Sequence, residues 1–473
     1  MKSNKKLQND EKQIVSKNIN YRLLLRMIEE KLNMWFPKMK GTAFQLVQGN
    51  SLEADFILQT PNVWGKPSDE VQINAGINVA EQITTLIASA ECFIDITTLH
   101  PFPDGTFFHA IQQGLKQVSQ NGRKITVRIL AGWPVFDNGT NQREYLQNLI
   151  EPFKSSENIS IFVAAQRNTD LTWNHAKIIA VDGKKAIIGG ENFWDANYLG
   201  PCPVHDLNIK FSGPLVYYLH KFIDIIWGNV NTYKTNSWKS VYWSLATGIQ
   251  KKCLVNSMIP QPTHVGNITM LGAGRYWSSD SRAADKAISY CFESANDTVY
   301  ISQMDLRIDF IIHREWQEGV EALVEAITRG VVVKIVISDD FGKASETNPA
   351  VSSKGTSYSY STQDKTFNAL VNLLKKQIND GKIIKGRLEV AVLRFGPSPL
   401  WPNQWGFANH AKFFMIDEQL FYIGSENLYP SDLIEYGVFI EDSEAVLKVK
   451  TDYWEKLWQY SSCTKLVFPN NSD

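Results

Sequence analysis

A histidine, a lysine, an aspartate and an asparagine occur together at two places in the chain. The first copy, WNHAKIIAVDGKKAIIGGEN, spans Trp173–Asn192, and the second, NHAKFFMIDEQLFYIGSEN, spans Asn409–Asn427. One constant offset relates the two sets, which are His175, Lys177, Asp182 and Asn192, and His410, Lys412, Asp417 and Asn427. A single copy could arise by chance, so it is the complete repetition that predicts a duplicated active-site half.

The spacing of the histidine and the lysine places both on one side of a strand. Alternate side chains of an extended strand face the same way, so we expect His175 to lie beside Lys177, and His410 beside Lys412. An imidazole next to an ammonium suits attack on an anionic centre. Of two histidines, one can act as nucleophile while the other acts as general acid and then as base. Lysines and asparagine amides can hold phosphoryl oxygens, and this chemistry requires neither a metal nor a cofactor.

The acidic residues of the two regions divide into two groups. Asp182 and Asp417 each lie five residues beyond their lysine, at a strand end, where a carboxylate can fix a turn; we interpret them as structural. Asp206 and Glu435 lie downstream of the two motifs, where a carboxylate could accept the other imidazole N–H and set its tautomer. A solvated surface acid is the alternative for both, and the sequence does not decide between them.

Helical and strand-like patterns alternate along both halves of the chain. In the first half, Gln72–Ala90 is typical of a helix that leads into a strand at Cys92–Thr97, and Thr106–Gln120 is a helix before the strand Lys124–Leu130. The pattern restarts in the second half, where Asp339–Thr366 forms a long polar insertion. Such alternation favours an α/β layered fold with a mixed or parallel sheet.

The length of 473 residues exceeds that of a usual single core, so two lobes are expected. We predict a flexible tail at residues 1–20, an N-terminal lobe with the first motif at 21–229, a linker rich in Pro, Gly and Asn at 230–273, and a C-terminal lobe with the second motif at 274–473.

Composition narrows the class of protein. A hydrophobic content of 44% and a charged content of 21% are ordinary for a soluble protein, and the net charge of −1 provides no bulk attraction for nucleic acid. The five cysteines are scattered without a CxxC pair, which favours neither a zinc site nor a disulfide framework. No apolar run approaches membrane-spanning length, so we expect any contact with a membrane to be peripheral.

The HxKxxxxD pattern followed by GG/GSxN resembles the phospholipase D superfamily. TPNVWG at Thr60–Gly65, TLHPFPDGTF at Thr98–Phe107 and SWKSVYWSLATG at Ser237–Gly248 resemble segments of the secreted actinomycete-type bacterial phospholipases D, and the similarity extends over about Arg22 to Ser461. It implies two similar lobes, each a mixed β-sheet flanked by helices, with one active site at their interface and a covalent phosphohistidine mechanism.

The resemblance also implies a role for each matching residue. His175 would attack phosphorus, and His410 would protonate the leaving alcohol and then activate water. The phosphoryl oxygens would be bound by Lys177, Lys412, Asn192 and Asn427. The histidines would be oriented by Asp206 and Glu435. The head-group pocket would be shaped by Trp194, Tyr198 and Tyr360.

These observations favour hydrolysis of phosphatidylcholine-like phospholipids to phosphatidic acid and a free head group, with transphosphatidylation to alcohols. The alternatives are a phosphodiesterase of the same superfamily that acts on nucleic acid, and a catalytically inactive lipid-binding relative. A cardiolipin-synthase role is less favoured without membrane helices. We expect a monomer that meets phospholipid at a membrane surface and binds no nucleic acid. Trp401 and Trp405 could enter that surface, or could pack within their loop.

Two features depart from the secreted relatives. Met1–Asn20 is polar, and the residues that follow form an amphipathic pattern, so no Sec signal peptide is recognisable. The disulfide cysteines of those relatives are mostly missing, although Cys253 occupies a similar place. The expected location is therefore the cytoplasm, or a host or target cell reached by an export route other than Sec.

Overall fold

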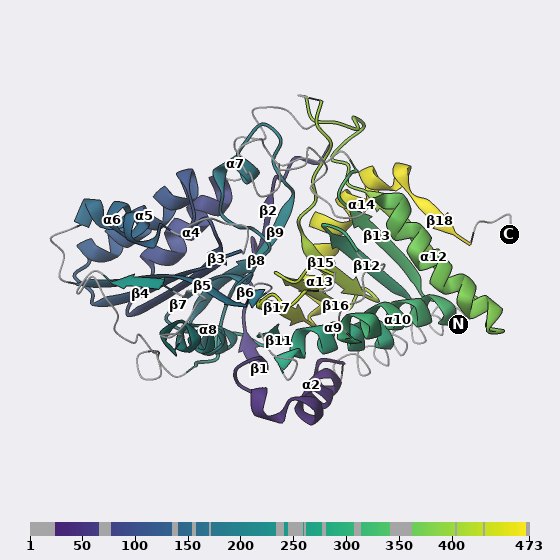
Figure 1. Cartoon of the computed structure of the whole chain (residues 1–473), viewed down its shortest axis with the longest axis horizontal. Helices are drawn as coiled ribbons and strands as arrows, with labels where there is room; N and C mark the ends of the chain where they lie inside the picture. Colours follow the sequence, from purple (N-terminus) through teal and green to yellow (C-terminus); the bar gives the residue numbers. More distant parts are fainter. Residues whose placement is uncertain are drawn as a thin grey trace, which may run out of the picture.

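The computed structural model shows two α/β halves, each built on one mixed sheet flanked by helices (Figure 1). This confirms the fold class expected from the sequence. The structure describes residues 24–65, 77–134, 141–153, 158–169, 172–232, 241–244, 259, 262–276, 281–306, 314–340, 362–402, 404–428 and 431–469.

The N-terminal sheet has the strand order β10-β5-β4-β3-β7-β8-β9-β2, with β6 paired to β5. Its strands are β2 (Ile57–Thr60), β3 (Phe93–Leu99), β4 (Ile125–Gly132), β5 (Ile159–Thr169), β6 (Thr172–Trp173), β7 (Lys177–Val181), β8 (Lys185–Gly189), β9 (Asp206–Ser212) and β10 (Val241–Ser244). Its helices are α4 (Ile77–Ala88), α5 (Gly105–Gln120), α6 (Gln142–Ile150), η2 (Glu151–Phe153), α7 (Asp195–Tyr198) and α8 (Leu215–Thr232). Strands β3, β4 and β5 are parallel, and β7, β8, β9 and β2 are antiparallel.

Helices cover both faces of this sheet, which explains the continuous apolar runs of its strands. In β7, Ile178 and Ala180 join the core that contains α8, whereas Ile179 and Val181 join the core that contains α4 and α5. Lys177 has the same parity as Ile179 and stands at the start of β7. The alternation of strand side chains therefore sets the face from which Lys177 enters the site.

The C-terminal sheet repeats this plan with the order β1-β11-β17-β16-β15-β12-β13-β14-β18. Its strands are β1 (Phe44–Asn50), β11 (Ile268–Arg275), β12 (Thr298–Gln303), β13 (Val332–Ile337), β14 (Arg387–Val392), β15 (Lys412–Ile416), β16 (Leu420–Gly424), β17 (Glu435–Ile440) and β18 (Leu466–Phe468). Its helices are α2 (Leu24–Trp35), η1 (Pro37–Met39), α9 (Ala283–Ser294), α10 (Arg314–Arg329), α12 (Gln363–Asn379), α13 (Ser443–Val449), the π-helical η4 (Lys450–Trp454), α14 (Glu455–Ser461) and η5 (Ser462–Thr464).

Two strands belong to sheets that the proposed division of the chain into lobes and a linker did not predict. Strand β1 precedes the first motif in sequence but pairs with β11 in the C-terminal sheet. Strand β10, from the segment expected to be a linker, pairs with β5 in the N-terminal sheet. One buried apolar cluster contains side chains of both halves, including Ile178 and Phe413. Strand β16 contacts β8 and β9, and β15 contacts β9. The two motifs are therefore held in one continuous packing arrangement.

No helix in the part of the chain that the structure describes is long and apolar enough to cross a membrane.

Candidate active site

Each motif histidine lies just before a strand and is tied through its backbone to the opposite half. The His175 N–H donates to the Ile434 carbonyl at 2.8 Å, and the His410 N–H donates to the His205 carbonyl at 2.6 Å. Ile434 and His205 immediately precede the first residues of β17 and β9. The main chain therefore places the first residue of each of these strands next to the other half's histidine.

Those first residues are the carboxylates that the sequence singled out, and each one contacts the imidazole of the opposite half. His175 Nδ1 lies 2.9 Å and 3.1 Å from the two oxygens of Glu435, and His410 Nδ1 lies 2.6 Å from Asp206 Oδ2. All four side chains are buried. A carboxylate at Nδ1 selects the tautomer with its proton on Nδ1, which leaves the Nε2 lone pair available.

Burial keeps both imidazoles neutral at neutral pH. Desolvation lowers the pKa of His175 to about 4, against the opposing effect of Glu435. The pKa of His410 falls to about 3 because desolvation and the Lys412 charge outweigh Asp206. A neutral imidazole with a free Nε2 has the form that a nucleophile requires.

The two motif lysines are fully buried beside the histidines. Lys177 Nζ donates to the His175 carbonyl at 2.5 Å, and Lys412 Nζ donates to the His410 carbonyl. Desolvation lowers the pKa of Lys412 to about 8 and holds that of Lys177 well below its usual range. Buried ammonium groups are costly unless they are paired, so an anion that enters between them is strongly favoured.

Asn192 and Asn427 follow β8 and β16 and are buried near the ends of these strands. The Asn192 carbonyl accepts a hydrogen bond from Thr98 Oγ1 at 3.0 Å, and its N–H donates to the Tyr198 hydroxyl at 3.2 Å. Asn192 is thus fixed by the end of β3 and by α7. The structure brings together seven of the residues expected in the site, which are His175, His410, Lys177, Lys412, Asp206, Glu435 and, through Tyr198, Asn192. Asn427 is buried at the equivalent position after β16.

The motif aspartates lie at the far ends of their strands and bind backbone rather than the site. Asp182 accepts hydrogen bonds from the N–H groups of Glu91, Cys92 and Phe93 at 2.6, 2.9 and 2.7 Å. Asp417 does the same for three consecutive N–H groups, those of Asn296, Asp297 and Thr298, at 2.9, 2.7 and 2.8 Å. Each carboxylate anchors the start of a central parallel strand.

Replacement of Asp182 by alanine is expected to lower the free energy of unfolding by about 3–4 kcal/mol, because several backbone donors lose a charged acceptor. The kcat of the folded fraction should stay near that of the wild type. Chemical denaturation and activity per folded molecule measure the two effects separately. A large loss of kcat in a fully folded Asp182→Ala protein would contradict the structural role.

Of the three residues expected in the head-group pocket, the structure describes two. The Tyr198 hydroxyl donates to Asp206 Oδ2 at 2.9 Å and lies 3.5 Å from His410 Nδ1, so this side chain supports the acid that faces His410. Trp194 is 5% exposed, and its indole N–H donates to the Pro101 carbonyl at 2.7 Å. Tyr360 lies outside the described residues.

The two tryptophans before the second motif are packed to different degrees. Trp401 is 1% exposed and contacts Phe395 and Phe407, so the expectation that it enters a membrane surface is wrong, and the loop-packing alternative holds for it. Trp405 is half-buried.

Comparison with known proteins places this geometry in a family. A family model described as cardiolipin synthase, PLD-like domain, matches residues 288–458. A phospholipase D from Streptomyces antibioticus is 30% identical over 497 residues, which cover 92% of this chain and 87% of that protein. The chain belongs to the phospholipase D superfamily. The crystal structure of phosphatidylserine synthase from Haemophilus influenzae Rd KW20 shares the fold, with a TM-score of 0.54 and 15% identity over 94% of this chain and 91% of that chain.

Membership identifies the protein as a phosphodiesterase of the phospholipase D family.

The structure also reveals buried residues next to the motifs that the sequence did not single out. Glu191 and Glu426 directly precede the motif asparagines, and both are buried. Glu191 accepts hydrogen bonds from Thr60 Oγ1 at 3.1 Å and from Asn208 Nδ2 at 2.8 Å, and burial raises its pKa to about 8. Their recurrence in GGEN and GSEN was the signal that could have identified them.

Arg275 is a third residue that the sequence did not single out. Its buried guanidinium lies 2.6 Å from Asp285 Oδ1, 3.0 Å from Glu426 Oε1 and 3.8 Å from Glu435 Oε1. Burial alone would raise the pKa of Glu435, but its interaction with His175 and the charges of Lys177 and Arg275 hold it below its usual value. Glu435 is therefore kept as an anion.

The two motifs differ at the residue before their glutamate, which is Gly190 in the first motif and Ser425 in the second. A Cβ on Gly190 would lie 2.0 Å from Asp206 Oδ1, so the close approach of Asp206 requires glycine. The equivalent residue in the second motif is Ser425, whose hydroxyl donates to Glu435 Oε2 at 2.5 Å. Glu435 thus receives a hydrogen bond from within the motif, whereas Asp206 receives one from Tyr198.

The pH dependence of kcat/KM is expected to follow His175, His410 and Lys412 of the free enzyme. His175 attacks only as a neutral group, and with a pKa of about 4 it is neutral at higher pH. Lys412 attracts an anion only when charged, and with a pKa of about 8 it loses that charge as the pH rises further. His410 must carry a proton to act as the acid, and its pKa is about 3. We therefore expect kcat/KM to be highest at about pH 3–4, to fall at higher pH as His410 loses that proton, and to fall more steeply above about pH 8, where Lys412 is also deprotonated.

A guanidinium stays charged across this range, so the Lys412→Arg variant should lose the steeper fall above about pH 8, whatever its remaining activity. Measurement of kcat/KM against pH for both proteins checks the assignment. An unchanged alkaline limb in Lys412→Arg would assign that limb to a different group.

Proposed function

We propose that the protein is a phospholipase D that hydrolyses phosphatidylcholine-like glycerophospholipids to phosphatidic acid and a free head group, through a phosphohistidine intermediate. The observation that carries this proposal is the pair of neutral imidazoles, each oriented by a carboxylate of the opposite half, next to two buried lysines. The similarity to a Streptomyces phospholipase D over most of both chains supports the lipid substrate. We further propose that the enzyme acts as a monomer at a membrane surface, without a metal or other cofactor.

In the first step, His175 Nε2 forms a bond to phosphorus while the bond between phosphorus and the head-group oxygen breaks. His410 donates a proton from Nε2 to that oxygen, so the head group leaves as a neutral alcohol. The arriving phosphodiester is an anion, and its charge beside His410 favours the protonated imidazole that this step needs. The lysines stabilise the charge that develops on the phosphoryl oxygens.

In the second step, His410 removes a proton from a water molecule, and the water oxygen attacks phosphorus and displaces His175. The phosphorylated imidazole carries a positive charge until then, and the Glu435 anion lies against its Nδ1–H. An alcohol that replaces the water gives a new phosphodiester, which is transphosphatidylation.

The test is choline release from phosphatidylcholine vesicles, with and without ethanol. We expect choline in both cases and phosphatidylethanol only when ethanol is present, with the His175→Ala protein as the control for contaminating activity. Cleavage of plasmid DNA without lipid turnover would contradict the proposal and would favour a nuclease of the same family. Lipid binding without turnover would favour an inactive relative.

Turnover is expected to persist in excess EDTA, because the side chains of the site supply the nucleophile, the acid and the positive charge. No group of three or more His, Cys, Asp or Glu side chains among the described residues is arranged to hold a metal ion. Activity assays before and after chelation, with restoration by added divalent cations as the control, measure this. A loss that a metal ion reverses would contradict the proposed mechanism.

A further inference from the structure

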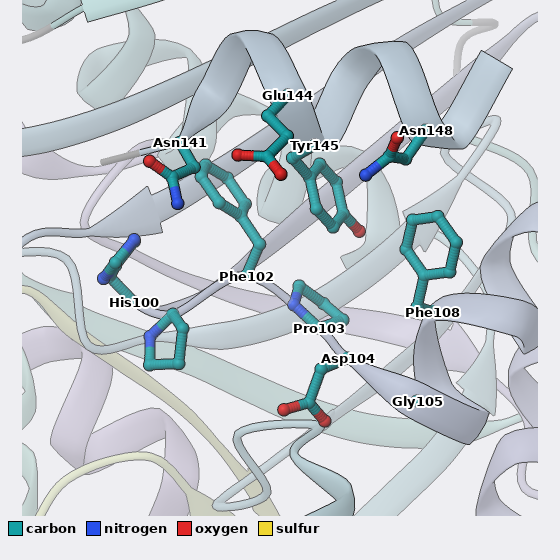
Figure 2. A pocket seen from close by; sticks show the side chains of 11 residues that line it. His100, Phe102, Pro103, Asp104, Gly105, Phe108, Asn141, Glu144, Tyr145 and Asn148 are labelled. Carbon is teal, nitrogen blue, oxygen red and sulfur yellow. The ribbon is translucent and has the colours of Figure 1, made fainter. Parts of the chain in front are cut away.

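A pocket of about 490 Å³ lies between α6 and the segment that follows β3 (Figure 2). Its lining residues on that segment and the start of α5 are His100, Pro101, Phe102, Pro103, Asp104, Gly105 and Phe108. The surface that it exposes is almost entirely apolar. Its size and lining are typical of sites for small apolar ligands.

One face of α6 forms the other wall. Glu144, Tyr145 and Asn148 are separated by helical intervals and so lie on the same side of the helix, and Asn141, at its N-cap, extends this wall. Tyr145 stacks on Phe102 with ring centroids 4.7 Å apart, and the Phe108 ring meets Tyr145 edge-on at 5.5 Å (Figure 2). The pocket is therefore bounded by aromatic rings that hold one another in place.

The pocket is joined to the active site through the end of β3. Thr98 contacts two residues of the first motif, since its carbonyl accepts from Asn174 Nδ2 at 2.8 Å and its hydroxyl donates to the Asn192 carbonyl at 3.0 Å. His100, in the pocket wall, is only two residues further on, which is about 7 Å of backbone at most.

The same wall is also fixed to the residues that follow Asn192. Trp194 Nε1 donates to the Pro101 carbonyl at 2.7 Å, the Asp195 N–H donates to Asp104 Oδ1 at 2.7 Å, and the Thr106 N–H donates to Asp195 Oδ1 at 2.8 Å. The two segments hold each other by reciprocal contacts, so the pocket has a fixed position relative to the phosphate-binding residues.

We propose that this pocket binds the first part of one acyl chain of the lipid whose phosphate lies between His175 and His410. The inference rests on the proposed function and adds a site for the hydrocarbon. Among the described residues that line the pocket, Asp104 and Glu144 carry charge and none is a lysine or an arginine, so this lining does not suit a second phosphate. An apolar wall instead favours methylene groups, each of which can lower KM by up to about fourfold when fully buried.

The test blocks the mouth of the pocket from the surface of α6. Asn148 and Glu144 are exposed and line the pocket, whereas Gln147 is exposed on the same helix and does not. Asn148→Trp and Glu144→Trp are the blocking variants, and Gln147→Trp is the matched control. The substrates are monomeric diacyl phosphatidylcholines of increasing chain length, kept below their critical micelle concentrations, and deacylated glycerophosphocholine.

For the wild type and Gln147→Trp, we expect KM to fall several-fold with each added methylene until the pocket is filled. For the blocking variants, KM should depend little on chain length, while kinetics on glycerophosphocholine stay unchanged in all four proteins. Calorimetric binding of monomeric dodecyl maltoside provides a readout that needs no turnover. Binding should occur in the wild type and the control and be at least tenfold weaker in the blocking variants.

Equal chain-length dependence and equal detergent binding in all four proteins would overturn the inference. Competition by tetramethylammonium, without any effect of chain length, would overturn it in favour of a cation site. Absence of turnover on every phosphatidylcholine, together with detergent binding that the blocking variants lose, would reject the proposed function and keep a hydrocarbon site. Absence of both turnover and binding would reject both.

Discussion

Replacement of His175 by alanine is expected to reduce kcat by at least about 10⁴-fold, because it removes the atom that forms the covalent bond to phosphorus. The His175 imidazole is buried against Glu435, so the variant also leaves this buried carboxylate without its imidazole partner. Thermal unfolding must therefore accompany the kinetics. A folded His175→Ala protein with near-normal kcat would refute the assignment of the nucleophile.

The complementary variant is His410→Asn, which separates the two steps. With a p-nitrophenyl phosphodiester, whose leaving group needs little protonation, we expect one equivalent of nitrophenol to be released quickly and further release to be slow. The phosphoryl group should then be found on His175 by peptide mass analysis under alkaline conditions. A phosphorylated His175→Asn protein would instead assign the nucleophile to His410.

Much of this site could be predicted from the sequence because its histidines, lysines and asparagines recur at fixed short spacings. The histidine–lysine spacing and the terminal asparagine lie on single strands and their ends, so two short segments define the positions of six of the eight groups. The other two, Asp206 and Glu435, begin β9 and β17. The same is true of regular elements with strong periodicity. Thr106–Gln120 was expected to be a helix, and α5 spans Gly105–Gln120; the strand expected at Lys124–Leu130 is β4 at Ile125–Gly132.

What the sequence could not supply is the pairing between halves. Nothing local indicates that Glu435 of the second half orients His175 of the first, or that β1 joins the sheet of the second motif. These contacts depend on how two separately patterned sheets pack. Arg275 is a further example, because it acts on the site only through the carboxylates that the fold gathers around it.

The crossed pairing changes the meaning of the duplicated motif. Each half brings a histidine and a lysine, but the acid that sets the tautomer of that histidine belongs to the partner half. A single half would thus have an imidazole with no oriented proton. The shared buried core supports catalysis because it fixes the two sheets relative to each other. A small rotation between the sheets would break both histidine–carboxylate contacts at once.

For this reason, Asp206→Asn and Glu435→Gln are expected to lose about 10²–10⁴-fold in kcat while remaining folded. An amide can present its NH₂ group to Nδ1, which shifts the proton to Nε2 and removes the lone pair needed there for attack or for activation of water. The loss should differ between steps. Glu435→Gln should slow the formation of the phosphoenzyme, because Glu435 faces His175, whereas Asp206→Asn should mainly slow its breakdown and give a burst with the p-nitrophenyl substrate.

The matched control is Tyr198→Phe, which keeps the Asp206 carboxylate and removes one of its hydrogen bonds, so its loss should be smaller than that of Asp206→Asn. Rapid-quench kinetics distinguish the two steps, and nitrogen NMR of the imidazoles reports the tautomer directly. If both carboxylate variants kept the Nδ1–H tautomer and lost less than about tenfold in either step, the crossed carboxylates would have no role in tautomer selection, and their conserved geometry in the two halves would have to be explained by packing alone.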